Sequence, residues 1–124
     1  MTTNEQVRDG ATINRTELGI HEHFGGFTWE WSVSYDGGGS QTIGGWALDD
    51  KPSSPGGGRT PTAYGMAFIV ALLAAAGVTH WEKLAGRPIV VVRDGHRGQA
   101  IGIEPVAGQP GTPFLFADVS QAIG

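Results

Sequence analysis

The sequence predicts an α+β fold, an antiparallel β-sheet packed against one main buried α-helix plus a short second helix. The segment "FTWEWSVSY", residues 27–35, alternates apolar and polar side chains with the period of two that is typical of a half-buried strand. The segment "PTAYGMAFIVALLAAA", residues 61–76, is apolar almost all round, as a buried helix is. Shorter strand-like runs lie on both sides of this helix, so the order is strands, helices, then strands.

The length of 124 residues fits one domain. The polar residues 1–10 predict a disordered N-terminal tail, and residues 11–124 then form the single α+β domain. Within it, "ATINRTELGI", residues 11–20, is the first candidate strand. We expect residues 27–35 and 40–48 to pair as an antiparallel hairpin around the turn "DGGGS", with Gly44-Gly45 as a bulge or a point of close approach.

The segment 49–59, "DDKPSSPGGGR", is rich in Pro, Gly and Ser and predicts a flexible loop, either a lid or a tolerated insertion. Thr60 and Pro61 then suit the cap and the first position of the main helix, and Gly77 suits the position just past its end. Thr79 and Glu82 have the spacing of a capping box and predict the second helix.

Three apolar segments follow this second helix. "RPIVVV" and "QAIGIEPV" predict two strands that are joined by the turn "RDGHRG". The segment "TPFLFADV" predicts one last strand, or else a tail that covers a partner chain.

Composition excludes several classes of protein. The 8 basic and 12 acidic side chains give a net charge of −4, which argues against a duplex nucleic-acid binder. The chain has no cysteine, so disulfides and thiolate sites are excluded. No apolar run near the start resembles a signal peptide, and the apolar stretch 63–78 is short for a membrane span. We therefore expect a cytoplasmic protein without a membrane partner.

His21, Glu22 and His23 raise the question of a metal site. Residues i and i+2 of a strand share a face, so both imidazoles could bind one metal. A zinc site needs a third protein ligand, and no candidate has a fixed spacing from this pair. We expect a polar rim at the start of the aromatic strand, with no metal and no cofactor, and a metal-dependent enzyme using His21 and His23 is the alternative.

The predicted helix entrance is a second candidate site. A helix N-terminus favours anions, and Arg59, Thr60 and Tyr64 bring a cation and hydroxyls to it, although ordinary capping also explains these residue types. If Asp49 ends the neighbouring strand, the rim, the entrance and Trp46 line one cleft with an apolar wall and a few polar groups. The predicted partner- or ligand-binding residues are His21, Glu22, His23, Trp46, Arg59, Thr60 and Tyr64.

No pattern of nucleophile and base is present, so no catalytic residues are predicted. Phe27, Trp29, Trp31 and Tyr35 would lie on one strand face, a large apolar area for a chain of this length. Either the main helix covers this face or a second chain does. Because the area exceeds what one helix easily covers, we expect a homo-oligomer, most simply a homodimer.

The segments "GIHEHFG", "GGWALD", "GRTPTAYG" and "GVTHWEKLAGRPIVVV" lie between Leu18 and Ile103. Over this range the chain resembles a group of small proteins encoded by tailed bacteriophages. The sequence departs from the group's expected Asp-His-Gly at Glu22-His23-Phe24. The resemblance implies a phage accessory protein in the host cytoplasm that inhibits or sequesters a host protein or a small anionic ligand, as counter-defence factors do. A minor structural or assembly protein of the virion is the other alternative.

Overall fold

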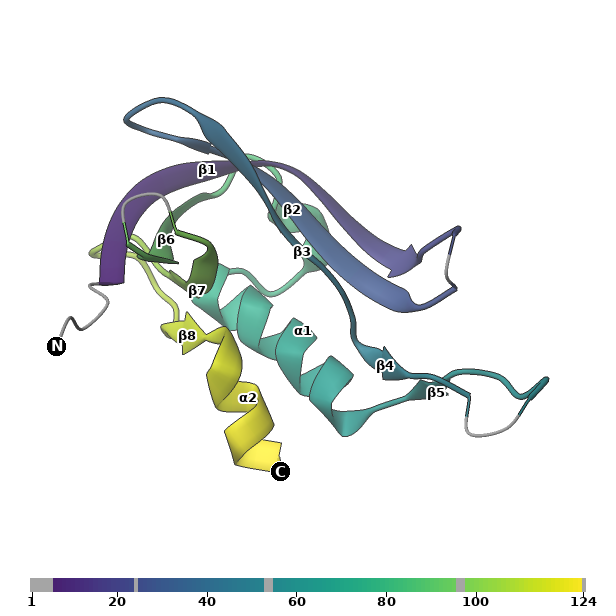
Figure 1. Cartoon of the computed structure of the whole chain (residues 1–124). Helices are drawn as coiled ribbons and strands as arrows, with labels where there is room; N and C mark the ends of the chain where they lie inside the picture. Colours follow the sequence, from purple (N-terminus) through teal and green to yellow (C-terminus); the bar gives the residue numbers. More distant parts are fainter. Residues whose placement is uncertain (1–5, 24, 53–54, 96–97, 124) are drawn as a thin grey trace, which may run out of the picture.

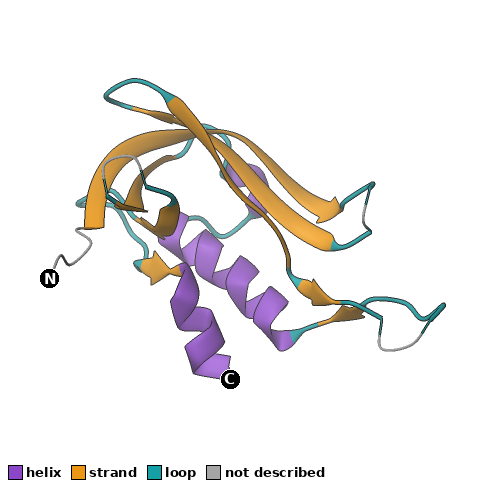
Figure 2. Cartoon of the chain, in the orientation of Figure 1, coloured by secondary structure: helices purple, strands orange, loops and turns teal. Residues whose placement is uncertain are grey.

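The computed structural model describes residues 6–23, 25–52, 55–95 and 98–123. Its main sheet is antiparallel throughout, and one main helix packs across one face of it, as Figures 1 and 2 show. This architecture confirms the predicted α+β fold. In order across the sheet the strands are β3 (Ser40–Ala47), β2 (Phe27–Tyr35), β1 (Gln6–Ile20), β6 (Pro88–Asp94), β7 (Ala100–Glu104) and β8 (Phe114–Leu115).

The long strand β1 pairs with its two neighbours along different parts of its length. Residues 6–12 pair with β6, whereas residues 11–20 pair with β2, with a register shift between Ile13 and Arg15. Among the described residues, β1 therefore has a strand on one side only beyond residue 12, and its end projects past β6 together with β2 (Figure 1). The predicted disordered tail is wrong for residues 6–10, which are part of β1, and residues 1–5 lie outside the described residues.

The hairpin of β2 and β3 confirms the predicted pairing and the predicted bulge. Thr28 pairs with Ala47 and Glu30 with Gly44, so Trp29 faces two residues of β3 instead of one. The extra residue brings Trp46 to the same face of the sheet as Trp29, and their ring centroids lie 5.2 Å apart. Because a Cβ at Gly44 would lie 2.6 Å from the carbonyl oxygen of Trp29, this bulge requires glycine.

The main helix α1, Ala63–Ala76, packs across the face of the sheet that carries Trp29. Phe68 and Leu72 are fully buried on it, and the Phe68 ring lies 5.5 Å from that of Trp29. Trp29 and Trp31 are fully buried within the chain, so of the two predicted ways to cover the aromatic face the structure shows cover by the main helix, and this face gives no reason for a homodimer. The surplus apolar surface lies elsewhere, on the outer side of α1.

The start of α1 corrects the predicted cap. Thr62 is the N-cap and its hydroxyl accepts a hydrogen bond from the N–H of Gly65, so α1 begins at Ala63. Thr60 and Pro61 form the short strand β5, which pairs with β4, Asp49–Asp50. The local sequence allows either threonine to cap the helix, and the pairing of β5 with β4 decides between them.

The short helices differ in detail from the expected ones. The second helix, η1, is a 3-10 turn at Trp81–Lys83, and the Thr79 hydroxyl lies 2.8 Å from His80 Nδ1 instead of capping it. The predicted capping box is therefore wrong. The last segment forms only the two-residue strand β8 before it becomes the helix α2, Phe116–Ile123, so the prediction of a longer final strand is also wrong. Gly77 ends α1 in the left-handed conformation, as predicted.

Residues 63–83 are long and apolar enough to cross a membrane by length and composition alone. In the structure this stretch comprises α1, the turn at Gly77 and η1. Phe68 and Leu72 are buried against the sheet, as they are in the core helix of a globular fold.

Candidate functional site

An apolar cavity of about 520 Å³, which we call the entrance cavity, lies beside the start of α1. It brings together the turn between β1 and β2, the end of the β3 segment, and the first turns of α1. Its volume is in the range of small-molecule sites, and apolar side chains provide most of its wall. The lining residues are Ile20, Gly25, Phe27, Leu48, Asp49, Arg59, Pro61, Thr62, Gly65, Met66 and Ile69.

An ion pair forms the polar side of the entrance cavity. The Arg59 Nε and Nη2 atoms lie 3.0 Å and 2.9 Å from Asp49 Oδ1, and the two side chains are 17% and 9% exposed. The hydrogen bond from Arg59 lowers the pKa of the Asp49 carboxyl; a backbone hydrogen bond from Phe27 acts in the same direction and burial opposes it. With Asp49 as its partner, Arg59 is already neutralised, so the structure gives little support to an anion site at the helix entrance.

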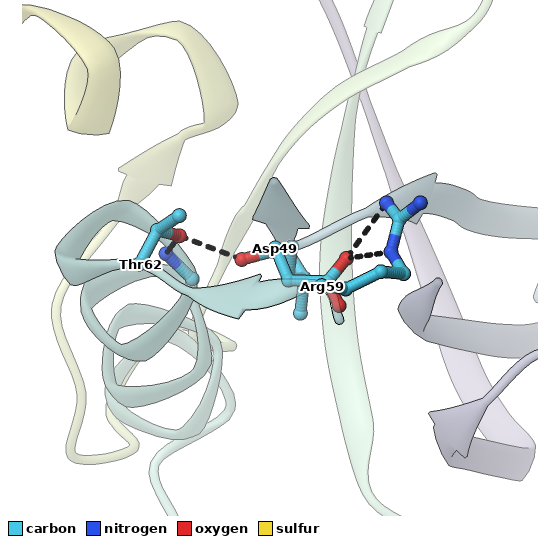
Figure 3. A network of polar contacts seen from close by, with 5 residues as sticks. Asp49, Arg59 and Thr62 are labelled. Carbon is cyan, nitrogen blue, oxygen red and sulfur yellow. Dashed lines mark hydrogen bonds and ion pairs between the residues drawn. The ribbon is translucent and has the colours of Figure 1, made fainter. Parts of the chain in front are cut away.

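The side chain of Thr62 joins the helix to the neighbouring strands. Its hydroxyl donates to the carbonyl oxygen of Leu48 at 2.7 Å and accepts from the N–H of Gly65 at 2.9 Å. Figure 3 shows Thr62 on the α1 side of Asp49 and the Arg59 guanidinium on its other side. The β4–β5 pairing and the Asp49–Arg59 pair therefore fix both ends of the predicted loop 49–59.

The predicted cleft is only partly present. Arg59 lines the entrance cavity, together with Ile20 and Gly25 from the two sides of the predicted rim. The rim residues His21, Glu22 and His23 are not among its lining residues, and His21 and Glu22 line a separate hollow beside β1. Trp46 instead packs against the aromatic cluster of the core and is 37% exposed. Tyr64 packs on Phe68, with ring centroids 5.7 Å apart. Thr60 is exposed on β5.

His21, Glu22 and His23 form the turn that follows β1. The N–H of His21 donates to the carbonyl oxygen of Gly26 at 2.8 Å, and the N–H of His23 donates to His21 Nδ1 at 3.1 Å. The two imidazole centroids lie 5.5 Å apart. Among the described residues, no group of three or more His, Cys, Asp or Glu side chains is arranged to hold a metal ion.

A second and more open hollow of about 920 Å³, which we call the edge groove, runs beside the end of β1. Its walls are β1 with the following turn on one side and the η1 region on the other. Three carboxylates line it, those of Glu17, Glu22 and Glu82. The other lining residues are Thr16, Leu18, Gly19, Ile20, His21, Thr28, Trp81 and Ala85.

No family model, curated protein or solved structure matches the chain. The resemblance to phage proteins therefore stays a prediction from the sequence.

Sequence reasoning missed the apolar residues Ile20 and Met66, which are 67% and 65% exposed and line the entrance cavity. The sequence indicated Asp49 only as the possible end of a strand and did not predict that it pairs with Arg59. Opposite charges at the two ends of one loop are a signal that could have indicated this pair. Nothing in the sequence indicates Met66, because the whole helix is apolar.

Proposed function

We propose that this protein is a non-enzymatic binding protein that takes an apolar group of its partner into the entrance cavity. The observation that supports this proposal is the apolar cavity itself, with exposed Ile20 and Met66 among its lining residues. Burial of exposed apolar side chains is the main favourable term in association, so such a cavity favours an apolar ligand group. The Asp49–Arg59 pair and Thr62 give the site a few polar groups that orient the ligand.

In the setting that the resemblance implies, the protein is a phage accessory factor in the host cytoplasm, and the apolar group belongs to a host protein that it inhibits or sequesters. We favour a protein partner over a small anionic ligand, because the charge of Arg59 is already neutralised by Asp49. The net charge of −4 argues in the same direction, since it repels free anions.

The test uses cyclohexanol as an apolar probe and follows methyl NMR signals of the intact protein. We expect saturable shifts at Ile20, Met66 and Ile69, which line the entrance cavity. Met66→Glu should abolish them, because it places a charge at the cavity. Ala63→Glu is the matched control, since Ala63 is exposed on the same helix but does not line the cavity.

Equal loss of probe binding in both variants, or shifts confined to residues outside the cavity, would contradict the proposal. Zinc bound in stoichiometric amount and lost on substitution of His21 and His23 would instead support the metal-dependent enzyme. Presence of the protein in purified virions would support the structural alternative.

A further inference from the structure

The end of β1 has an open edge, which we define as residues 14–20 on the side away from β2. On this side the neighbouring strand β6 stops at Pro88, opposite Thr12. The last backbone hydrogen bonds on this side join Ile13 to Arg87 and to Gly86, at 3.0 Å and 2.7 Å. Among the described residues, residues 14–20 have backbone–backbone pairing with β2 alone. The edge groove occupies the place where a further strand would lie.

The register shows which backbone groups point into this place. Ile20 pairs with Phe27, and the carbonyl of Phe27 is directed the other way, accepting from the N–H of Leu48 at 2.7 Å. Ile20 and Phe27 are therefore a pair whose backbone groups face away from each other. Such pairs alternate along an antiparallel ladder, so the N–H and C=O groups of Leu18 and Thr16 also point to the open edge.

Unpaired N–H and C=O groups along a strand edge are a template for another strand. In the edge groove this template lies next to the aromatic side chain of Trp81, which is half-buried and can contact alternate side chains of an added strand. At about 3.3 Å per residue the open edge is about 23 Å long, enough for a segment of about seven residues.

The charges around the edge groove indicate which kind of segment can bind there. Glu17, Glu22 and Glu82 line the edge groove, and none of the described residues that line it is Lys or Arg. Arg15 lies at the start of the open edge, where its guanidinium is 4.0 Å from Glu17 and 74% exposed. A second copy of this chain would bring the same carboxylates together, which is unfavourable at short range. A segment rich in Lys or Arg complements them.

We propose that the open edge of β1 receives an extended, basic segment of a partner protein, which adds to the main sheet as a further antiparallel or parallel strand in the edge groove. This site is distinct from the entrance cavity and does not depend on it, although Ile20 lines both. The basic side chains of the added strand contact Glu17, Glu22 and Glu82, and its apolar side chains face Trp81.

The probe is the peptide acetyl-Lys-Val-Lys-Val-Lys-Val-Lys-amide, compared with the same peptide carrying Glu in place of Lys. Amide hydrogen exchange of the intact protein is followed by NMR at low salt. With saturating basic peptide, exchange at Thr16, Leu18 and Ile20 should slow at least tenfold. Glu17 and Gly19 donate toward β2 already, so their exchange should change little.

Two pairs of variants separate the backbone and charge contributions. Thr16→Pro removes an N–H that points to the open edge and should weaken binding at least tenfold, whereas Thr16→Val keeps this N–H and should bind normally. Glu17→Gln should weaken binding about two- to fivefold. Asp118→Asn on α2 makes the same charge change away from the edge groove and should leave binding unchanged.

The proposal is overturned if the basic peptide leaves exchange at Thr16, Leu18 and Ile20 unaltered, or if the acidic peptide binds equally well. It is also overturned if a dimer of the free protein already protects these amides, because a second copy then fills the edge. If Thr16→Pro fails to fold, the amide exchange of the wild-type protein with the basic peptide still tests the proposal. Met66→Glu should leave peptide binding intact, so failure here is distinguishable from failure of the entrance cavity.

Discussion

Glu17 on β1 lies directly opposite Glu30 on β2, so two carboxylates are neighbours across the sheet. Like charges at directly opposed positions destabilise a strand pair by about 0.2–1 kcal/mol. Glu17 also lines the edge groove, where a basic strand would neutralise it. A local cost to stability at a position suited to binding is what is expected of a functional site.

We predict that Glu17→Gln and Glu30→Gln each raise the free energy of unfolding slightly, because either one removes the repulsion. The double variant should gain less than the sum of the two, since the repulsion can be removed only once. Urea unfolding of the four proteins at low salt checks this. Additive gains would mean that the two carboxylates do not interact.

The parts of the fold that the sequence predicted are those with a strong local signal. Residues 27–35 alternate with a period of two, and the structure has β2 at these residues. The Gly44-Gly45 pair predicted the bulge because few other residues tolerate its backbone. The spacing of apolar residues also contains a signal for α2. Phe116, Val119 and Ile123 stand three and four residues apart, the period of a helix rather than a strand.

The candidate site depends on tertiary relations that no local pattern contains. The open edge exists because β6 stops opposite Thr12 while β1 continues, and the lengths of two distant strands decide this. Similarly, Thr62 caps α1 because its hydroxyl also bonds to Leu48, 14 residues earlier. The sequence could predict that Arg59 lies near the β1–β2 turn only if Asp49 ends the strand before the loop.

The buried side of α1 gives a prediction for stability. Phe68→Ala should lower the free energy of unfolding by about 3–5 kcal/mol, because Phe68 is fully buried among the rings of the aromatic cluster. Val70→Ala should change it by less than about 0.5 kcal/mol, since Val70 is 57% exposed. Denaturant unfolding measures both, and similar losses in the two variants would contradict the packing of α1.

The homodimer stays a prediction, now for a different reason. Met66 and Val70 lie one helical turn apart and are 65% and 57% exposed, so α1 presents apolar surface to its surroundings. We expect light scattering at low micromolar concentration to give about twice the chain mass. A mass of 13.0 kDa alone would count against assembly.

The Asp49–Arg59 pair predicts a dependence of stability on pH. The pKa of Asp49 is lowered in the folded protein, so its contribution is fully present above the unfolded value of about 3.9 and is lost as pH falls through the folded value. At neutral pH, Asp49→Asn should cost about 1–3 kcal/mol, and this difference from the wild type should shrink on acidification below pH 4. Urea unfolding across this range measures it.

The adjacent residue Asp50 offers the control, because it is exposed and carries the same charge. Asp50→Asn should leave the acid dependence of unfolding as it is in the wild type. If Asp49→Asn and the wild type lost stability in parallel below pH 4, the pair would contribute nothing to that dependence.

For Gly65→Ala we predict a change in stability opposite to the one expected from helix propensity alone. Alanine inside a helix is more favourable than glycine by about 1 kcal/mol, so Gly65→Ala considered alone should stabilise α1. A Cβ at this position would, however, lie 2.1 Å from the carbonyl oxygen of Leu48, the same oxygen that accepts from Thr62. The helix must move away from Leu48, which breaks this hydrogen bond and deforms the entrance cavity.

We therefore expect Gly65→Ala to lower the free energy of unfolding by about 1–3 kcal/mol and to weaken binding of cyclohexanol at the same time. Ala63→Gly is the control for propensity, because Ala63 is exposed in the same turn of α1. It should cost at most about 1 kcal/mol and leave the entrance cavity intact, because no Cβ contact is introduced. A Gly65→Ala variant that is more stable than the wild type would show that α1 does not approach Leu48 so closely, and the entrance cavity would then lack the wall on which the proposed binding depends.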